Sequence, residues 1–434
     1  MNSHKHPINH KFSIAIFGTV LLLVMLNIFT PLRLNTDGIR YLNILEYLKG
    51  NLGNNSTAAH DYLPHGYPWL LYLLQHFNLL SSLSITLINI GAVLIAAYFL
   101  ADMLAIKNRF FYFSLILASF INIKHFELPV SDQFFTLVFI GSIYLWSHVF
   151  KGKTYFIIPA LLLTLLSIYI RTAGAAIIIG VLFYLCFLKK DVLFKKKVYL
   201  VTAGLLIAGF FTVFFIYLPL FEKKIDYIKQ LDLASIAKNP VAIIERFSIH
   251  IKEIGEIVIN SPYSKLSTLI NIHGFDIAAF VLIIAGLLAL YMFYRAVKQL
   301  KLYNLFVFWV YAGYLLIIIF WPFYDARFLI PIVPVFIYLF FYYLSSLSKS
   351  IIKLVPVVIY VVFGVVSLLY SDALSLSKPF FLKHYGFDQE LTKKYEIHFK
   401  NEQLDKISRP VYNINDDDIL YLLEKYDRSP SKNN

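Results

Sequence analysis

Residues 84–104 read SITLINIGAVLIAAYFLADML and contain a single charged residue, Asp102. As an α-helix this stretch would be about 30 Å long, which matches the hydrocarbon core of a bilayer. Residues 199–220, YLVTAGLLIAGFFTVFFIYLPL, repeat the pattern without any charge. Of the 434 residues, 59% are hydrophobic and 15% are charged, whereas soluble domains are roughly half apolar and a quarter charged. The sequence therefore predicts an all-α polytopic membrane protein.

Apolar runs of this length predict about eleven transmembrane helices. They cover residues 12–30, 84–104, 109–125, 131–150, 154–170, 172–188, 198–219, 275–295, 303–321, 327–347 and 352–370. The first run has no small-residue cleavage site after it, so it predicts a retained anchor rather than a signal peptide. A further stretch, 67–80, would be about 21 Å long as a helix, which favours an interfacial or re-entrant segment.

The distribution of lysine and arginine predicts the orientation, because short cytoplasmic loops collect basic residues. If 67–80 does not cross, the basic short loops all fall on one side: Lys107 and Arg109; Lys151 and Lys153; Lys189, Lys190, Lys195, Lys196 and Lys197; Arg295, Lys298 and Lys301; Lys349 and Lys353. We therefore expect a cytoplasmic N-terminus and an outer C-terminus in the plasma membrane. The net charge of +13 follows from this topology, so nucleic acid is not an expected partner.

This threading predicts two parts: a transmembrane domain, 1–370, and a small extracytoplasmic tail, 371–434. The domain would carry two long outer loops, 31–83 and 220–274. The second loop contains NPVAIIERFSIHIKEIGEIVIN, in which apolar residues recur at helical spacing: Ile244, Phe247, Ile251, Ile254 and Val258. With Asn239 as its cap, this stretch predicts an interfacial helix. It would either cover a lipid-borne substrate or pack onto the other outer loops.

Three acidic residues lie at the predicted outer surface, where they could act on a membrane-borne substrate. Asp37 follows the first span, Glu127 lies in a short turn, and Asp132 begins the span after that turn. A carboxylate can deprotonate or orient an acceptor hydroxyl. The simpler alternative for Asp37 and Asp132 is a helix N-cap, and Glu127 could be a solvated loop residue.

Two arginines at the same predicted depth could hold an anion. Arg171 lies between two short apolar runs, and Arg327 lies in WPFYDAR at residues 321–327. A guanidinium binds phosphate oxygens in a fork. The alternatives are snorkelling to lipid headgroups for Arg171, and for Arg327 either that or an ion pair with Asp325.

The stretch AHDYLPHGYPWLLYLL adds His65 and Tyr67, which enter the short apolar segment between Pro64 and Pro68. His60, Asp61 and His65 lack regular metal-ligand spacing, so a loop rich in polar residues is the preferred interpretation and a divalent metal stays an open alternative. Asp416, Asp417 and Asp418 precede an apolar run and predict a helix start. The single cysteine, Cys186, excludes an internal disulfide.

Taken together, these motifs resemble the GT-C superfamily of membrane glycosyltransferases, particularly protein O-mannosyltransferases and lipid A aminoarabinose transferases. Asp37, Gly38 and Tyr41 resemble its first-loop motif, and DYLPHGYPWLL resembles its proline-rich helix entry. Asp132 in SDQFFTLVFI, Arg171, and RFLIPIVP at residues 327–334 resemble later elements. The chain departs from the family in having no second acid next to Asp37 and in the residues around the paired prolines.

The resemblance implies transfer of a sugar from a polyprenyl-phosphate carrier to a glycan, lipid or protein acceptor outside the cytoplasm. Asp37 would act as base or acceptor orienter and Asp132 would assist, while Arg171 and Arg327 would bind the lipid phosphate. Further candidates for substrate contacts are Tyr41, His65, Tyr67 and Glu127. The alternatives are a polymerase or ligase of lipid-linked glycans, a transporter or flippase of lipid-linked sugars, and an inactive relative.

Overall fold

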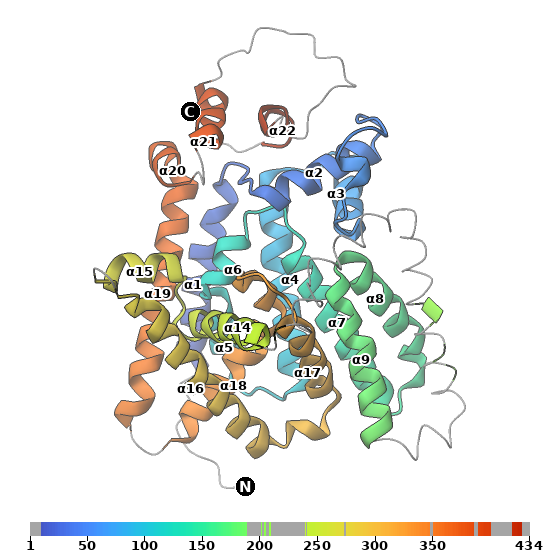
Figure 1. Ribbon diagram of the computed structural model, residues 1–434, viewed down its shortest axis with the longest axis vertical. Helices are drawn as coiled ribbons and strands as arrows, with labels where there is room; N and C mark the ends of the chain where they lie inside the picture. The colour runs from blue at the N-terminus through green and yellow to red at the C-terminus, as the bar shows by residue number, and fades with distance from the viewer. Residues whose placement is uncertain are drawn as a thin grey trace.

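The computed structural model describes residues 10–188, 241–272, 275–347, 350–385, 389–400 and 419–427, with a few single positions between 201 and 239. Every regular element in these ranges is a helix (Figure 1). Most of the predicted span 198–219, all of 220–238 and the acidic run 416–418 lie outside the described residues.

Six helical segments among the described residues are long and apolar enough to cross a membrane: His10–Phe29, Ser82–Met103, Asp132–Phe150, Ile277–Leu300, Ala326–Ser346 and Lys353–Leu376. They correspond to α1 (His10–Leu26) with the 3₁₀ turn after it, α4 (Ser82–Met103), α7 (Asp132–Phe150), α16 (Ile277–Leu300), η8 (Ala326–Ile332) with α18 (Val333–Ser346), and most of α19 (Ser350–Leu376). Three shorter apolar segments, Thr154–Ile170, Thr172–Leu188 and Phe306–Ile319, contain α8 (Ile157–Ile170), α9 (Ala175–Phe183) and α17 (Phe306–Ile319). The chain is thus a helical membrane protein by length and composition of its helices.

The predicted span 109–125 differs from the structure, because it is broken into α5 (Arg109–Leu117) and α6 (Phe120–His125). The side chain of Asn260 occupies the break. Its Oδ1 accepts a hydrogen bond from the Phe120 amide at 2.7 Å, and its Nδ2 donates to the carbonyls of Ala118 and Tyr360, each at 2.9 Å. The bonds to Phe120 and Ala118 satisfy backbone groups that a helix end leaves without partners, and the residue that makes them is distant in sequence.

The predicted outer loop 31–83 contains two short helices, α2 (Thr36–Leu48) and α3 (Gly66–His76). α3 has 11 residues, so its length of about 16 Å falls short of a bilayer core. Its first residue, Gly66, packs directly on the end of α8, because an added Cβ would lie 2.7 Å from the Tyr169 carbonyl oxygen. This contact brings the start of α3 next to the break between α8 and α9.

The predicted interfacial helix is α14 (Val241–Ile259), which is followed by α15 (Tyr263–Ile270). α14 crosses α16 at very short range, since a Cβ on Gly255 or on Gly286 would lie 2.0 Å from a carbonyl oxygen of the other helix. Of the predicted apolar stripe, Ile244 and Phe247 are 67% and 43% exposed. The buried residues of α14 include both apolar and charged side chains: Arg246, His250, Ile251, Glu253, Ile254, Glu256, Ile257 and Val258.

The C-terminal helices α20 (Lys378–His384), α21 (Gln389–Lys400) and α22 (Ile419–Tyr426) lie at the upper end of the molecule in the view of Figure 1. The predicted boundary at residue 370 falls inside a helix, because α19 continues to Leu376. α22 is tied to α2 through Glu46, which accepts hydrogen bonds from Tyr421 and Tyr426 and pairs with Lys425 at 2.6 Å. In the described part of the tail, α22 is therefore packed onto α2.

Candidate functional site

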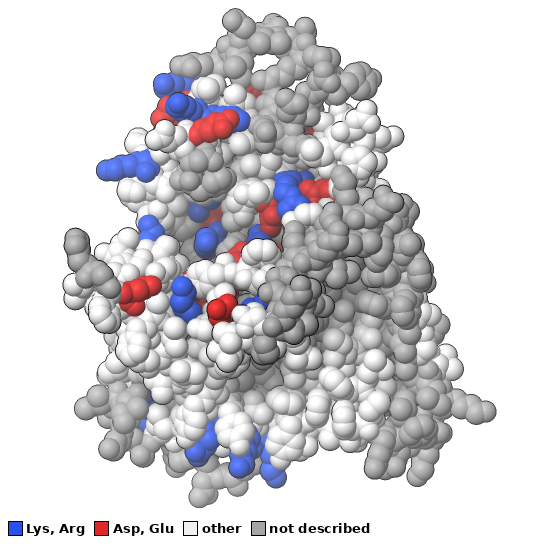
Figure 2. Space-filling model, viewed as in Figure 1, with Lys and Arg blue, Asp and Glu red and all other residues white. Residues whose placement is uncertain are grey.

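A cavity of about 360 Å³ lies where five parts of the chain meet: α2, the segment 62–64, the start of α7, the break between α8 and α9, and the segment 321–328. Its walls carry six charged side chains, three acids and three arginines: Asp37, Asp132, Asp325, Arg40, Arg171 and Arg327. On the face shown in Figure 2, acidic and basic side chains lie next to one another in a hollow in the upper half.

Asp37 lies in the first turn of α2, with a side chain that is 22% exposed. The helix cap is Asn35 instead, whose side chain accepts a hydrogen bond from the Gly38 amide at 2.7 Å. Asp37 is thereby released from capping, and its Oδ2 lies 2.8 Å from Nη1 of Arg327. The other oxygen, Oδ1, lies 3.5 Å from Arg40.

Asp132 and Arg171 form an ion pair on the opposite wall of the cavity. Their side chains are 2% and 14% exposed. Asp132 is the first helical residue of α7 and is therefore not at the N-cap position, which Ser131 occupies without a side-chain capping bond. Arg171 has an extended backbone that separates α8 from the 3₁₀ turn before α9, so the break in the helix aims its side chain into the cavity rather than along a helix face.

Arg327 joins the two walls. Its guanidinium contacts Asp37 at 2.8 Å and Asp325 at 3.3 Å, and its Nε lies 4.0 Å from Oδ2 of Asp132. Asp325 also caps η8 by accepting a hydrogen bond from the Arg327 amide at 3.0 Å. The anticipated pairing of Arg327 with Asp325 is present, and it coexists with the contact to Asp37.

Tyr41 lies between these walls, and its hydroxyl shares a hydrogen bond of 3.0 Å with Ser131. Burial raises the pKa of Tyr41 to about 12, so the phenol is neutral at physiological pH. Tyr67 is buried and packs edge-on against the Tyr41 ring, with the centroids 5.2 Å apart. Tyr67 thus supports Tyr41, while His65, the residue before α3, is outside the cavity lining.

Arg40 was not a candidate from the sequence. It pairs with Asp61 at 2.6 Å and lies over the Tyr62 ring, 4.4 Å from its centroid. Its position three residues after Asp37 on one helix was the available signal, because residues at that spacing share a face. Trp321, Phe323 and Tyr324 also line the cavity. The sequence signal for these aromatic residues was their position close to Arg327 in WPFYDAR.

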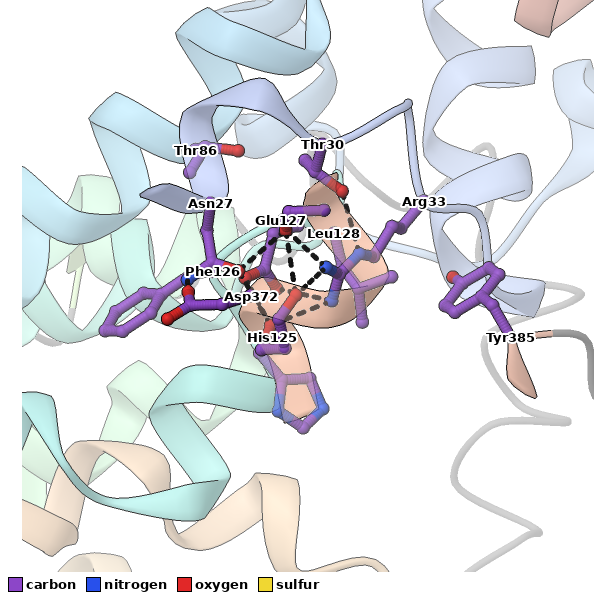
Figure 3. A network of polar contacts seen from close by, with 12 residues as sticks. Asn27, Thr30, Arg33, Thr86, His125, Phe126, Glu127, Leu128, Asp372 and Tyr385 are labelled. Carbon is purple, nitrogen blue, oxygen red and sulfur yellow. Dashed lines mark hydrogen bonds and ion pairs between the residues drawn. The ribbon is translucent and has the colours of Figure 1, made fainter. Parts of the chain in front are cut away.

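Glu127 belongs to a different cluster (Figure 3). It is fully buried and pairs with Arg33 at 3.3 Å, and it accepts a hydrogen bond from Ser371 at 3.0 Å. Burial raises the pKa of Glu127, although the positive charge of Arg33 acts in the opposite direction. The Arg33 side chain also donates to Ser371 and Ser375 of α19. Glu127 therefore joins the first loop to α19 and does not line the cavity.

Metal-ligating side chains do not gather in groups of three or more anywhere in the described residues. Of His60, Asp61 and His65 in the proline-rich loop, Asp61 accepts hydrogen bonds from Arg40 through both carboxylate oxygens, at 2.6 and 2.8 Å. The cavity lining offers carboxylates, guanidinium groups and aromatic rings.

Comparison of the chain with family models, curated proteins and solved structures gave no match. Function is therefore inferred from the cavity itself.

Proposed function

We propose that this protein is a membrane glycosyltransferase that moves a sugar from a polyprenyl-phosphate-linked donor to an acceptor at the outer face of the membrane. The observation that supports this proposal most is the meeting of Asp37, Asp132, Arg171 and Arg327 at one cavity. These residues come from four separate parts of the chain, and each was a candidate from sequence. The resemblance to GT-C enzymes gives the same four residues corresponding roles.

In this proposal the acceptor hydroxyl lies against Asp37. The carboxylate takes the hydroxyl proton as the acceptor oxygen bonds to the anomeric carbon, and the bond from that carbon to the phosphate oxygen breaks with its electron pair. Arg171 and Arg327 stabilise the negative charge on the departing lipid phosphate, because preorganised cations act most strongly where charge develops. Both arginines are held by carboxylates before substrate arrives, Arg171 by Asp132 and Arg327 by Asp37 and Asp325.

The proposal includes the topology predicted from the basic loops, with about eleven spans, a cytoplasmic N-terminus and an outer C-terminus. The charged side chains visible at the lower end of the molecule are basic (Figure 2), and α16 ends there with Lys298 in its last turn. The C-terminal helices lie at the opposite end (Figure 1). A cysteine-labelling map in intact cells tests this orientation. Labelling of positions 37 and 327 from opposite compartments would contradict it.

Mass spectrometry of glycolipids and glycoproteins from cells with and without the protein tests the activity and names the substrates. We expect loss of the protein to cause accumulation of a polyprenyl-phosphate sugar together with an under-glycosylated acceptor. Unchanged carrier and acceptor pools would count against transferase activity, whereas carrier displaced between leaflets without transfer would indicate a flippase.

The variant Asp37→Asn tests the assigned base. General base catalysis contributes about 10²- to 10⁴-fold, so we expect a loss of transfer in that range while the purified variant stays folded. Asp102→Asn is the matched control, because Asp102 lies in α4 away from the cavity and is 40% exposed. Near-normal turnover of Asp37→Asn would remove the base assignment.

A further inference from the structure

The charged face of α14 is turned toward the segment 320–325, which carries part of the cavity wall. Three of its side chains bond to the backbone of that segment. Arg246 donates to the Phe320 carbonyl at 2.7 Å, His250 contacts the Trp321 carbonyl at 2.9 Å, and Glu253 accepts from the Asp325 amide at 2.6 Å. A helix in the second outer loop thus holds a segment that joins α17 to η8.

A fourth residue of this face, Glu256, fixes the same segment through a side chain. It accepts hydrogen bonds from the Tyr324 hydroxyl and from the Tyr263 amide. Lys252 lies over the rings of Tyr263 and Tyr324, at 3.8 and 4.2 Å from their centroids. α14 thus holds Tyr324 on one side, and Tyr324 also lines the cavity.

The hydrogen bonds of His250 require a proton shared with Glu253. The backbone carbonyl of Trp321 can only accept, so Nε2 must carry a hydrogen. Nδ1 lies 2.8 Å from Oε2 of Glu253, and this contact also needs a hydrogen, carried by the ring or by the carboxyl group. A neutral imidazole facing an ionised carboxylate can make only one of the two bonds. Both bonds together therefore require one proton more than that state holds.

We propose that His250, Glu253 and Glu256 are positioning residues that hold the 320–325 segment against the cavity. In this proposal, the hydrogen bonds that hold the segment depend on the proton shared by His250 and Glu253. Through this segment they place Tyr324 and Asp325, and Asp325 in turn contacts Arg327 at 3.3 Å. The inference rests on the proposed function only in treating the cavity as a substrate site. Its test reads the position of the segment and needs no turnover.

The surroundings of the pair favour retention of the shared proton. Burial raises the pKa of Glu253, and burial also raises the pKa of Glu256. The other charged groups on α14 near this face are Arg246 and Lys252, and the segment and η8 contribute Asp325 and Arg327. Of the helices packed against α14, α16 approaches through the backbone of Leu282 and Gly286. The Tyr360 carbonyl of α19 accepts a hydrogen bond from Asn260, the residue after α14. A rise in pH removes the shared proton and is expected to release one of the two bonds.

The test places a fluorine reporter in the segment. Cys186, the only cysteine of the chain, is first replaced by serine, and Phe323→Cys, at a position that is 50% exposed, is labelled with a trifluoromethyl thiol reagent. ¹⁹F NMR spectra of the purified protein in detergent are recorded across pH. We compare three further variants in this background: Glu253→Gln, His250→Ala and the matched control Glu245→Gln. Glu245 lies on the exposed side of the same helix.

We expect the labelled parent and Glu245→Gln to shift from one state to a second as pH rises, over about two pH units for a single proton. Glu253→Gln should stay in the low-pH state throughout, because the amide can donate to a neutral imidazole and still accept from the Asp325 amide. His250→Ala should show the second, high-pH state, in which the segment is released, at every pH. A pH-independent parent spectrum, or a Glu253→Gln spectrum that titrates like the parent, would overturn the proposal. These outcomes hold even if no sugar transfer is found, so the two proposals fail separately.

Discussion

The ion pair between Arg171 and Asp132 gives the sharpest test of the cavity. Its side chains are 14% and 2% exposed, which places it among buried pairs rather than among the surface pairs that contribute about 0 to 1 kcal/mol. In Arg171→Met, the ion-pair partner left to Asp132 among the described residues is the distant Nε of Arg327, at 4.0 Å. Breaking a buried pair costs about 3 to 5 kcal/mol, because an uncompensated charge remains. We expect a loss of that size in the free energy of unfolding.

The double variant Arg171→Met with Asp132→Asn separates structure from function. Removing both charges relieves the uncompensated carboxylate, so we expect it to recover at least about 2 kcal/mol relative to Arg171→Met. Binding of polyprenyl phosphate should stay weakened in both variants, because the guanidinium that would hold the phosphate is absent. Arg171→Lys should bind more weakly than the parent, since an ammonium group lacks the planar fork.

The assays are denaturant unfolding of the purified protein in detergent and titration with polyprenyl phosphate. A loss of less than about 1 kcal/mol in Arg171→Met would place the pair in the surface class and refute the buried cavity wall. Parent-like phosphate binding by the double variant would refute the assigned role of Arg171.

Two other predictions concern the elements that frame the cavity. Gly255→Ala should destabilise the protein by about 1 to 3 kcal/mol, because the added Cβ would lie 2.0 Å from the Leu282 carbonyl oxygen. The control is Gly91→Ala, whose Cβ would meet nothing within 4 Å. Equal thermal stability of the two variants would contradict the packing of α14 on α16. The contact of α2 with α22 should weaken as pH falls below about 4.5. Burial acts to raise the pKa of Glu46, but hydrogen bonds from Lys425 and other donors outweigh burial and lower that pKa. The stabilisation is therefore present above the unfolded-state pKa and is lost as the carboxylate of the folded protein is protonated. Hydrogen exchange of α22 at neutral and acidic pH measures this, and Glu46→Gln should remove the pH dependence.

Much of the candidate site could be predicted because its signals are local. A long apolar run predicts a membrane helix regardless of its neighbours, and a charge at the end of such a run, like Asp132 or Arg171, is conspicuous without any knowledge of its partner. Asp37 and Arg327 were found in the same way, and the structure places these four residues at one cavity. The roles of these residues in catalysis stay a proposal.

The sequence by itself thus determined that the chain is a helical membrane protein, and it selected most of the charged residues that meet at the cavity. Tertiary structure decided the partners. Arg33 bonds to a residue 338 positions away, which places Glu127 in a separate cluster, and Asn260 divides a predicted span from 140 positions away. The charged face of α14 was likewise visible only in the folded chain. Hydropathy is a property of a segment and can be summed along it, whereas a buried hydrogen bond depends on which distant groups the fold brings within about 3 Å.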